Sequence, residues 1–235
     1  LCNFIPQIMT YMDADNAIKR RERTLKKLEQ LGIDYCDDLP LIGGYKLRKS
    51  EKRICKRFIA SLFFAFQASD YLQDPDIFAT EGRERTEKAV ETFKLKKYLF
   101  ADETKMLNGE CNERIATDAS WGIECCYALA WALGFVSTEE MEMANDLAEP
   151  QELLEIVTPF HAFKDFKASC KIRHKSEVMD MLDLYYNYHW ACDDHRTRPA
   201  TKCGELNEGV VMERRKALEW LVAKDKDWDD IFLDT

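Results

Sequence analysis

The sequence contains no apolar run long enough to cross a membrane. Its longest apolar stretch, residues 58–68 (FIASLFFAFQA), is far shorter than the roughly 20 residues that a spanning helix needs. The chain also lacks an excess of positive charge, because its net charge is −9. An acidic surface is repelled by nucleic acids and by anionic membranes. We therefore expect a core helix over 58–68, and neither a membrane nor a nucleic acid as partner.

The signature motifs of several common enzyme classes are also missing. The sequence has no GxxxxGK followed by Ser or Thr, no GxGxxG and no GxSxG, which removes the common nucleotide-binding and serine-hydrolase signatures. It has no CxxC or HExxH element either. His189, Cys192 and His195 repeat every third residue, but each such step turns back by about 60° around a helix, so the outer two cannot easily reach one ion. We expect no metal and no cofactor.

The cysteines do not resemble a disulfide framework. There are nine, an odd number, and no secretory leader opens the chain as printed. Cys55, Cys125, Cys126 and Cys192 fall in predicted helices, where cysteine behaves as a small apolar residue. We therefore expect a cytoplasmic protein in a reducing compartment. The sequence does not decide whether a further segment precedes Leu1.

Helical periodicity runs through nearly the whole chain, and no alternation of apolar and polar residues is long enough for a strand. We predict an all-α protein that forms a single globular domain over residues 1–235, with roughly eight to ten helices and no significant sheet. In this arrangement an N-terminal helix and connector, 1–48, pack on a main helical body, 49–235.

Glycine, serine and apolar spacing set the limits of the main helices. The first helix is expected from about Asp13 to Leu31, on the surface, with a thin stripe of Ile18, Leu25 and Leu28. Ser50 is expected to cap the second helix. The most hydrophobic helix should span about 113–133 and end at Gly134. Ser176 is expected to cap a further long helix that runs to about His195.

Two arginines near the end of the chain point toward the protein interior. Arg214 falls in the middle of the apolar arc of its predicted helix, and Arg215 lies at the edge of that arc. An unpaired charge in an apolar interior costs several kcal/mol or more. Arg214 therefore needs a carboxylate, a carbonyl or a ligand anion as its partner.

Glu124 is the only charged residue in the stretch 119–135, and helical spacing stacks it with Trp121 and Trp131. It should be at least half buried, and Arg214 is the obvious cation to pair with it. Two interpretations remain open. The pair can fix the register of two helices, or it can belong to a ligand or catalytic site.

The long helix after Ser176 separates into polar and apolar faces. Asp180, Asp183, Asn187 and Asp194 share one polar stripe, so Asp183 is expected in solvent, while His189 projects from the apolar face. His189 is then either a hydrogen-bonded core residue or a functional one. The candidate polar cluster consists of Glu124, His189, Arg214 and Arg215, flanked by Trp121, Trp131 and Trp190.

Several segments together resemble the bacterial family known as domain of unknown function 4272. These segments are RRERTLKKLEQLGI, LRKSEKRICKRFIAS, WGIECCYALAWALGF, LDLYYNYHWA and ERRKALEWL with the following WDDIFLDT. The resemblance covers nearly the whole chain and implies an all-helical cytoplasmic protein. The family carries no established activity, cofactor or catalytic set. The chain departs from it in its many cysteines and at Cys192, where a more polar residue is expected.

We expect a non-enzymatic cytoplasmic helical protein that binds a partner protein or a small ligand through an exposed apolar groove or patch. The alternative is a hydrolase-like enzyme in which Glu124, His189 and Arg214 surround a pocket. There the carboxylate or imidazole would act as general base and the guanidinium would hold an anionic group. A purely structural subunit is a third hypothesis, and the oligomeric state stays open.

Overall fold

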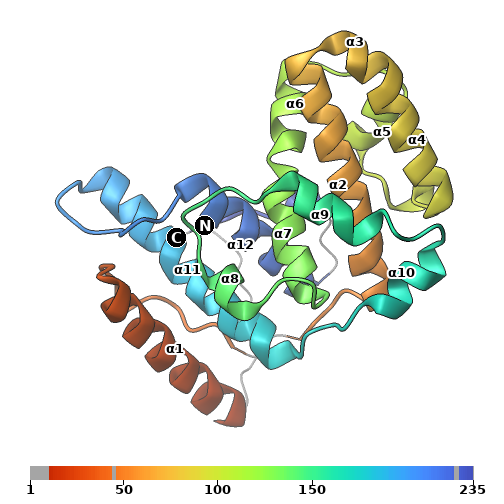
Figure 1. Ribbon diagram of the computed structural model, residues 1–235. Helices are drawn as coiled ribbons and strands as arrows, with labels where there is room; N and C mark the ends of the chain where they lie inside the picture. Colours follow the sequence, from red (N-terminus) through yellow and green to blue (C-terminus); the bar gives the residue numbers. More distant parts are fainter. Residues whose placement is uncertain (1–10, 44–45, 225–227, 235) are drawn as a thin grey trace. The chain divides into compact units, whose positions relative to one another are not determined.

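The computed structural model describes residues 11–43, 46–224 and 228–234, and all regular structure in these ranges is helical (Figure 1). The all-α prediction is confirmed. Contacts divide the chain into two compact units, of which unit 1 comprises residues 1–48, 142–145 and 174–235 and unit 2 comprises residues 49–141 and 146–173. The single domain over 1–235 stays a prediction.

Each unit is built from its own set of helices. Unit 1 contains α1 (Tyr11–Leu31), α11 (Lys175–Thr197), α12 (Glu208–Val222) and the short turn η3 (Trp228–Asp230). Unit 2 contains α2 (Glu51–Gln73), α3 (Pro75–Ile77), η1 (Phe78–Gly82), α4 (Arg83–Thr92), η2 (Lys96–Tyr98), α5 (Ala101–Leu107), α6 (Glu113–Ser120), α7 (Gly122–Ala132), nearly all of α8 (Thr138–Glu142), α9 (Pro150–Val157) and α10 (Phe163–Ser169). Among the residues described, no helix combines the length and apolar character needed to cross a membrane.

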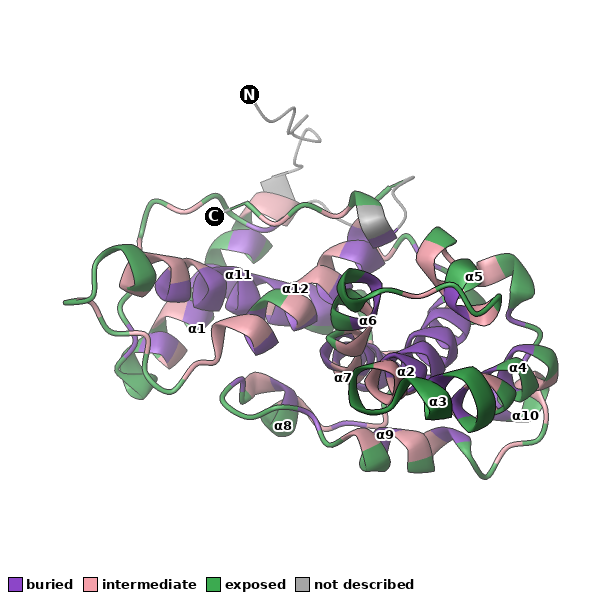
Figure 2. Cartoon of the chain, turned by 90° about the horizontal axis from the view of Figure 1, so that it is seen from above, coloured by how far each residue is buried: buried purple, intermediate pink, exposed green. Residues whose placement is uncertain are grey.

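Helix α2 forms the centre of unit 2. The Ser50 side chain accepts a hydrogen bond from the Arg53 amide, so the predicted cap is confirmed. Residues 54–65 are all buried (Figure 2). Most of them are apolar, but Lys56, Arg57 and Ser61 are buried among them. Helices α4, α6 and α7 pack around α2. The expected core helix over 58–68 is therefore the middle of α2.

The predicted helix over 113–133 is in fact two helices, α6 and α7. Regular α-helical structure is interrupted at Trp121, just before Gly122, and the Glu124 amide bonds the Trp121 carbonyl at 3.1 Å. This bond spans three residues instead of four and tightens the turn. Trp121, expected beside the buried Glu124, is 37% exposed and lies at the surface. Gly134, with φ +88°, follows the end of α7 as predicted.

Helix α1 packs on α11, and α12 packs on another part of α11 (Figure 1). Gly32 ends α1 with φ +66°, as predicted. The predicted apolar stripe is only partly right, because Leu28 is buried but Ile18 is 47% exposed. The buried face of α1 contains Ala17, Arg20, Arg21, Thr24 and Leu28. Unit 1 is therefore held together partly through buried arginines.

Candidate functional site

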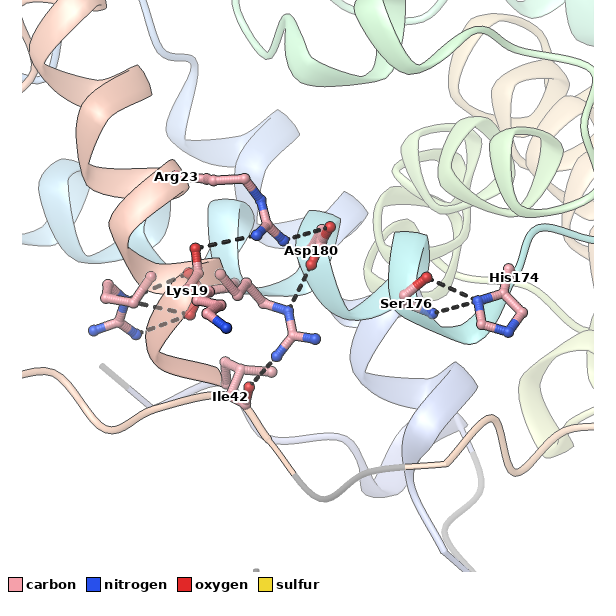
Figure 3. Close-up of polar contacts among 9 residues, drawn as sticks. Lys19, Arg23, Ile42, His174, Ser176 and Asp180 are labelled. Atoms are coloured by element: carbon pink, nitrogen blue, oxygen red, sulfur yellow. Dashed lines mark hydrogen bonds and ion pairs between the residues drawn. The ribbon is translucent and has the colours of Figure 1, made fainter. Parts of the chain in front are cut away.

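Helix α11 is the element on which the buried polar residues of unit 1 converge. The predicted Ser176 cap is wrong, because His174 caps the helix and α11 begins at Lys175. The His174 Nδ1 atom accepts from the Ser176 amide at 3.3 Å (Figure 3). The Glu177 carboxylate accepts from the His174 amide at 2.9 Å. Two reciprocal bonds thus fix where α11 starts, and with it the direction of every later side chain.

Helix α11 carries two separate polar faces, and both are largely buried. We call Asp180, Asp183 and Asn187 the acidic face, and Tyr186 and His189 the imidazole face. The positions of Asp183 and His189 differ by about 120° around the helix axis at 100° per residue. The acidic face meets arginines of α1, and the imidazole face meets an arginine of α12.

On the acidic face, Asp183 is 0% exposed, so its prediction as a solvent-facing residue is wrong. Arg21 Nη2 lies 2.9 Å from Asp183 Oδ1, and both groups are buried. The same guanidinium donates to the carbonyls of Leu39 and Pro40, each at 2.9 Å. The buried charge of Arg21 is therefore balanced by one carboxylate and solvated by two backbone oxygens.

Asp180 lies one turn earlier, where solvent reaches it. Its two oxygens accept from Arg20 Nε at 2.7 Å and from Arg23 Nη2 at 2.9 Å (Figure 3). Arg20 also donates to the Ile42 carbonyl at 2.6 Å. The Asp180 side chain is 42% exposed, so these ion pairs are screened by water and weaker than the pair at Asp183.

Helix α12 brings Arg214 and Arg215 to the interior of unit 1. Asn207 caps the helix by accepting from the amides of Gly209 and Val210. Both arginines are only 2% exposed, which confirms that they point inward. Arg214 Nη1 donates to the Met143 carbonyl at 2.8 Å. A carbonyl was one of the partners that the sequence required for this arginine.

Arg215 contacts four different groups in unit 1. Its Nη1 lies 2.6 Å from His189 Nδ1, and its Nη2 donates to the Asp234 carbonyl at 2.9 Å. Its guanidinium stacks 4.5 Å from the centre of the Tyr186 ring. Glu219 lies farther away, at 3.5 Å from Nη2. Arg215 therefore joins α11, α12 and the segment that follows η3.

This contact fixes the chemical state of His189. Burial, and then the charge of Arg215, lower the pKa of His189 from 6.5 to about 4. The ring is therefore neutral at pH 7. Because a guanidinium can only donate, Nδ1 is the acceptor and Nε2 carries the proton. Burial also lowers the pKa of Arg215, which nevertheless stays charged.

Glu124 lies on α7 in unit 2 and is 0% exposed, as its surroundings predict. Its Oε1 accepts from the Ala148 amide at 2.7 Å, which ties α7 to the segment before α9. Trp131 of α7 is fully buried, and Trp190 of α11 is half-buried. Of the four candidates, His189 and Arg215 are in direct contact. The pairing of Glu124 with Arg214 stays a prediction.

The buried residues Arg21, Asp183 and Asn187 were missed by the sequence analysis. A signal for Arg21 was present, because Ala17, Arg21, Thr24 and Leu28 follow one another at steps of four, three and four residues. This spacing places all four on one helix face. No similar local signal marks Asp183, whose neighbours on the stripe are all polar.

Among the residues described, no three His, Cys, Asp or Glu side chains gather as a metal site would require. A family model described as "Domain of unknown function (DUF4272)" matches residues 20–231. The chain belongs to this family. The matched span of the DUF4272 family includes both buried arginine pairs and all of α11, which confirms the resemblance seen in the sequence. No curated protein and no solved structure matches the chain.

Proposed function

We propose that this chain is a non-enzymatic helical protein of the bacterial cytoplasm that binds a partner protein or a small ligand. One observation carries the proposal. The buried arginines of α12 hold two backbone segments, and these segments bear the most exposed large apolar side chains of the described part of unit 1. The arginines are thus supports for a binding surface and not its reactive groups.

The two exposed side chains are Met143 and Phe232. Arg214 holds the carbonyl of Met143 itself, and Met143 is 59% exposed. Arg215 holds the carbonyl of Asp234, two residues beyond Phe232, which is 82% exposed. Aromatic and methionine side chains are enriched in the cores of protein interfaces, where they bury much apolar area. A partner that covers them would explain their exposure.

The same contacts argue against the hydrolase alternative. A histidine base needs a free lone pair, but Nδ1 of His189 accepts from Arg215, and Nε2 carries the proton. His189 is 6% exposed and Arg214 is 2% exposed, which leaves little room for substrate and water. These groups are better suited to holding the chain together than to proton transfer.

The proposal is tested by thermal-shift screening of the full chain against nucleotides, metabolites and metal ions, together with sizing chromatography. A ligand that binds only the folded state at 100 times its Kd stabilises it by about 2.7 kcal/mol. The ligand that raises the melting temperature of the wild type should no longer do so in Met143→Ser and Phe232→Ser. Leu31→Ser is the matched control, since Leu31 is 50% exposed on α1.

If the partner is a protein, one defined partner should co-elute with the wild type and with Leu31→Ser in sizing chromatography. It should not co-elute with Phe232→Ser. A stable homo-oligomer that survives both serine substitutions would instead favour the purely structural subunit. Hydrolysis of an ester, amide or phosphate panel that disappears in a folded His189→Gln variant would overturn the proposal in favour of the enzyme.

A further inference from the structure

Unit 2 contains two cysteine thiols that face each other. Cys55 of α2 and Cys170, the residue that follows α10, have their Sγ atoms 3.6 Å apart. Helix α10 packs beside α2 (Figure 1). Cys55 is 0% exposed, whereas Cys170 is only half-buried. We propose that this pair is a peroxide-sensitive dithiol, in which Cys170 is oxidised first and Cys55 then closes a disulfide.

The surroundings distinguish the two thiols. The hydrogen bond from the Cys55 thiol lowers the pKa of Cys170, and the Lys167 ammonium lowers it further, although Glu51 and burial oppose them. Lys167 lies 3.0 Å from Glu51, so both charges stay near the pair. The same hydrogen bond and burial raise the pKa of Cys55. Cys170 is therefore the better nucleophile and also the one that a small oxidant can reach.

The chemistry needs one peroxide and no other reactant. The Cys170 thiolate attacks one peroxide oxygen, the O–O bond breaks, and the departing hydroxide takes up the proton that Cys170 lost. A sulfenic acid and one water result. The Cys55 sulfur then attacks the Cys170 sulfur, an S–S bond forms, and the S–O bond breaks as hydroxide leaves with the Cys55 proton. In total two thiols and hydrogen peroxide give one disulfide and two waters.

The position of Cys170 favours closure. A disulfide needs a sulfur separation of about 2.05 Å, so the two sulfurs must approach by roughly 1.5 Å. Cys170 already has extended backbone at the end of α10 and is not inside a regular helix. The bond would link residues 115 positions apart and tie α10 to α2.

The test treats the purified full chain with hydrogen peroxide and maps its tryptic peptides. Cys55 lies in peptide 54–56 (ICK) and Cys170 in peptide 168–171 (ASCK), so the linked pair is easily identified. We expect these peptides to link first, and the link to disappear with a small dithiol. Cys111, which is half-buried in unit 2 and has a pKa raised by burial, serves as the reference thiol.

The order of events is tested with a sulfenic-acid probe such as dimedone. In Cys55→Ser the probe should label Cys170, whereas in Cys170→Ser peroxide should consume the Cys55 thiol at least about tenfold more slowly than in the wild type. Cys111→Ser should still form the 55–170 link. The wild-type map decides the question even if Cys55→Ser fails to fold. Oxidation of Cys170 no faster than Cys111, first labelling of Cys55, or a dominant link between other cysteines would overturn the proposal.

Discussion

Helices α1 and α12 each bring a buried arginine to α11, but α11 receives the two arginines differently. Arg21 of α1 meets the buried carboxylate of Asp183, whereas Arg215 of α12 meets a neutral imidazole, a carbonyl and an aromatic ring. The first contact cancels a charge with a charge. The second disperses a positive charge mainly over neutral acceptors, with the Glu219 carboxylate farther away at 3.5 Å. One helix therefore shows two solutions to the problem of a buried guanidinium.

The difference determines which perturbation should destabilise the contacts of each face of α11. The acidic face depends on an ion pair, so removing one member leaves a bare buried charge. The imidazole face depends on His189 staying neutral, because a protonated ring would set two positive charges against each other at the 2.6 Å contact. The first face should be sensitive to substitution, and the second to pH.

The largest effect is expected on the acidic face. Asp183→Asn keeps the shape of the side chain but leaves Arg21 without its carboxylate, which should lower the free energy of unfolding by about 3–5 kcal/mol. Urea denaturation measures this loss. Asp180→Asn is the matched control, and because its side chain is 42% exposed it should cost only about 0–1 kcal/mol. Equal losses in the two variants would remove the distinction between buried and exposed pairs.

Acidification should act on the imidazole face. The folded-state pKa of His189 is about 4 and the unfolded value is near 6.5. Between these pH values the unfolded chain binds more protons, so stability from this group is complete above pH 6.5 and falls until about pH 4. The expected loss is up to about 3 kcal/mol.

This pH effect is measured by urea denaturation between pH 4 and pH 7 in the wild type and in His189→Gln, which cannot be protonated. Other acidic groups titrate equally in both proteins, so the difference isolates His189. Parallel stability curves for the two proteins would show that His189 keeps its ordinary pKa and that the contact with Arg215 is not maintained in solution.

A smaller effect is expected from Arg215→Lys, which keeps the charge but loses the planar fork. One ammonium cannot reproduce the bonds to both His189 and Asp234, so the variant should lose about 2 kcal/mol, which is typical of one hydrogen bond to a charged group. Hydrogen exchange should accelerate over residues 228–234. In the matched variant Arg214→Lys, exchange should accelerate over 142–145 instead. Identical exchange patterns would contradict the separate roles of the two arginines.

The smallest effect concerns the residue that sets the start of α12. Asn207→Ala removes the acceptor of the Gly209 and Val210 amides and should cost about 1 kcal/mol. Asn207→Asp preserves that acceptor and should be nearly neutral by thermal denaturation. If both substitutions cost the same, the cap does not contribute to holding Arg214 and Arg215 in place.

The inward direction of Glu124, His189 and Arg214 could be predicted because it depends only on helical periodicity over a few turns. All three are buried as expected. The all-α fold, the Ser50 cap and the Gly32 and Gly134 ends follow from equally local signals. The main errors in helix extent came where two helices, α6 and α7, follow each other without a proline or a polar loop.

The partners of these residues could not be predicted, because a helical wheel shows which residues share a face and not what covers that face. Asp183 illustrates the limit. Its stripe is polar throughout, which is typical of a solvated face, yet Arg21, 162 positions earlier, makes it a buried one. The charged helix α1 was likewise predicted to lie on the surface. Two of its arginines are nevertheless buried and bond to carboxylates of α11.

The discontinuous make-up of unit 1 has a consequence for protein synthesis. Arg20 and Asp180 are 160 residues apart, and unit 2 is nearly continuous between them. At roughly 5–20 residues per second, a ribosome exposes α1 for on the order of 10–30 s before its counterpart emerges. Unit 2 can fold in that interval, while the nascent α1 waits with Ala17 and Leu28 uncovered, a state in which a chaperone would find it.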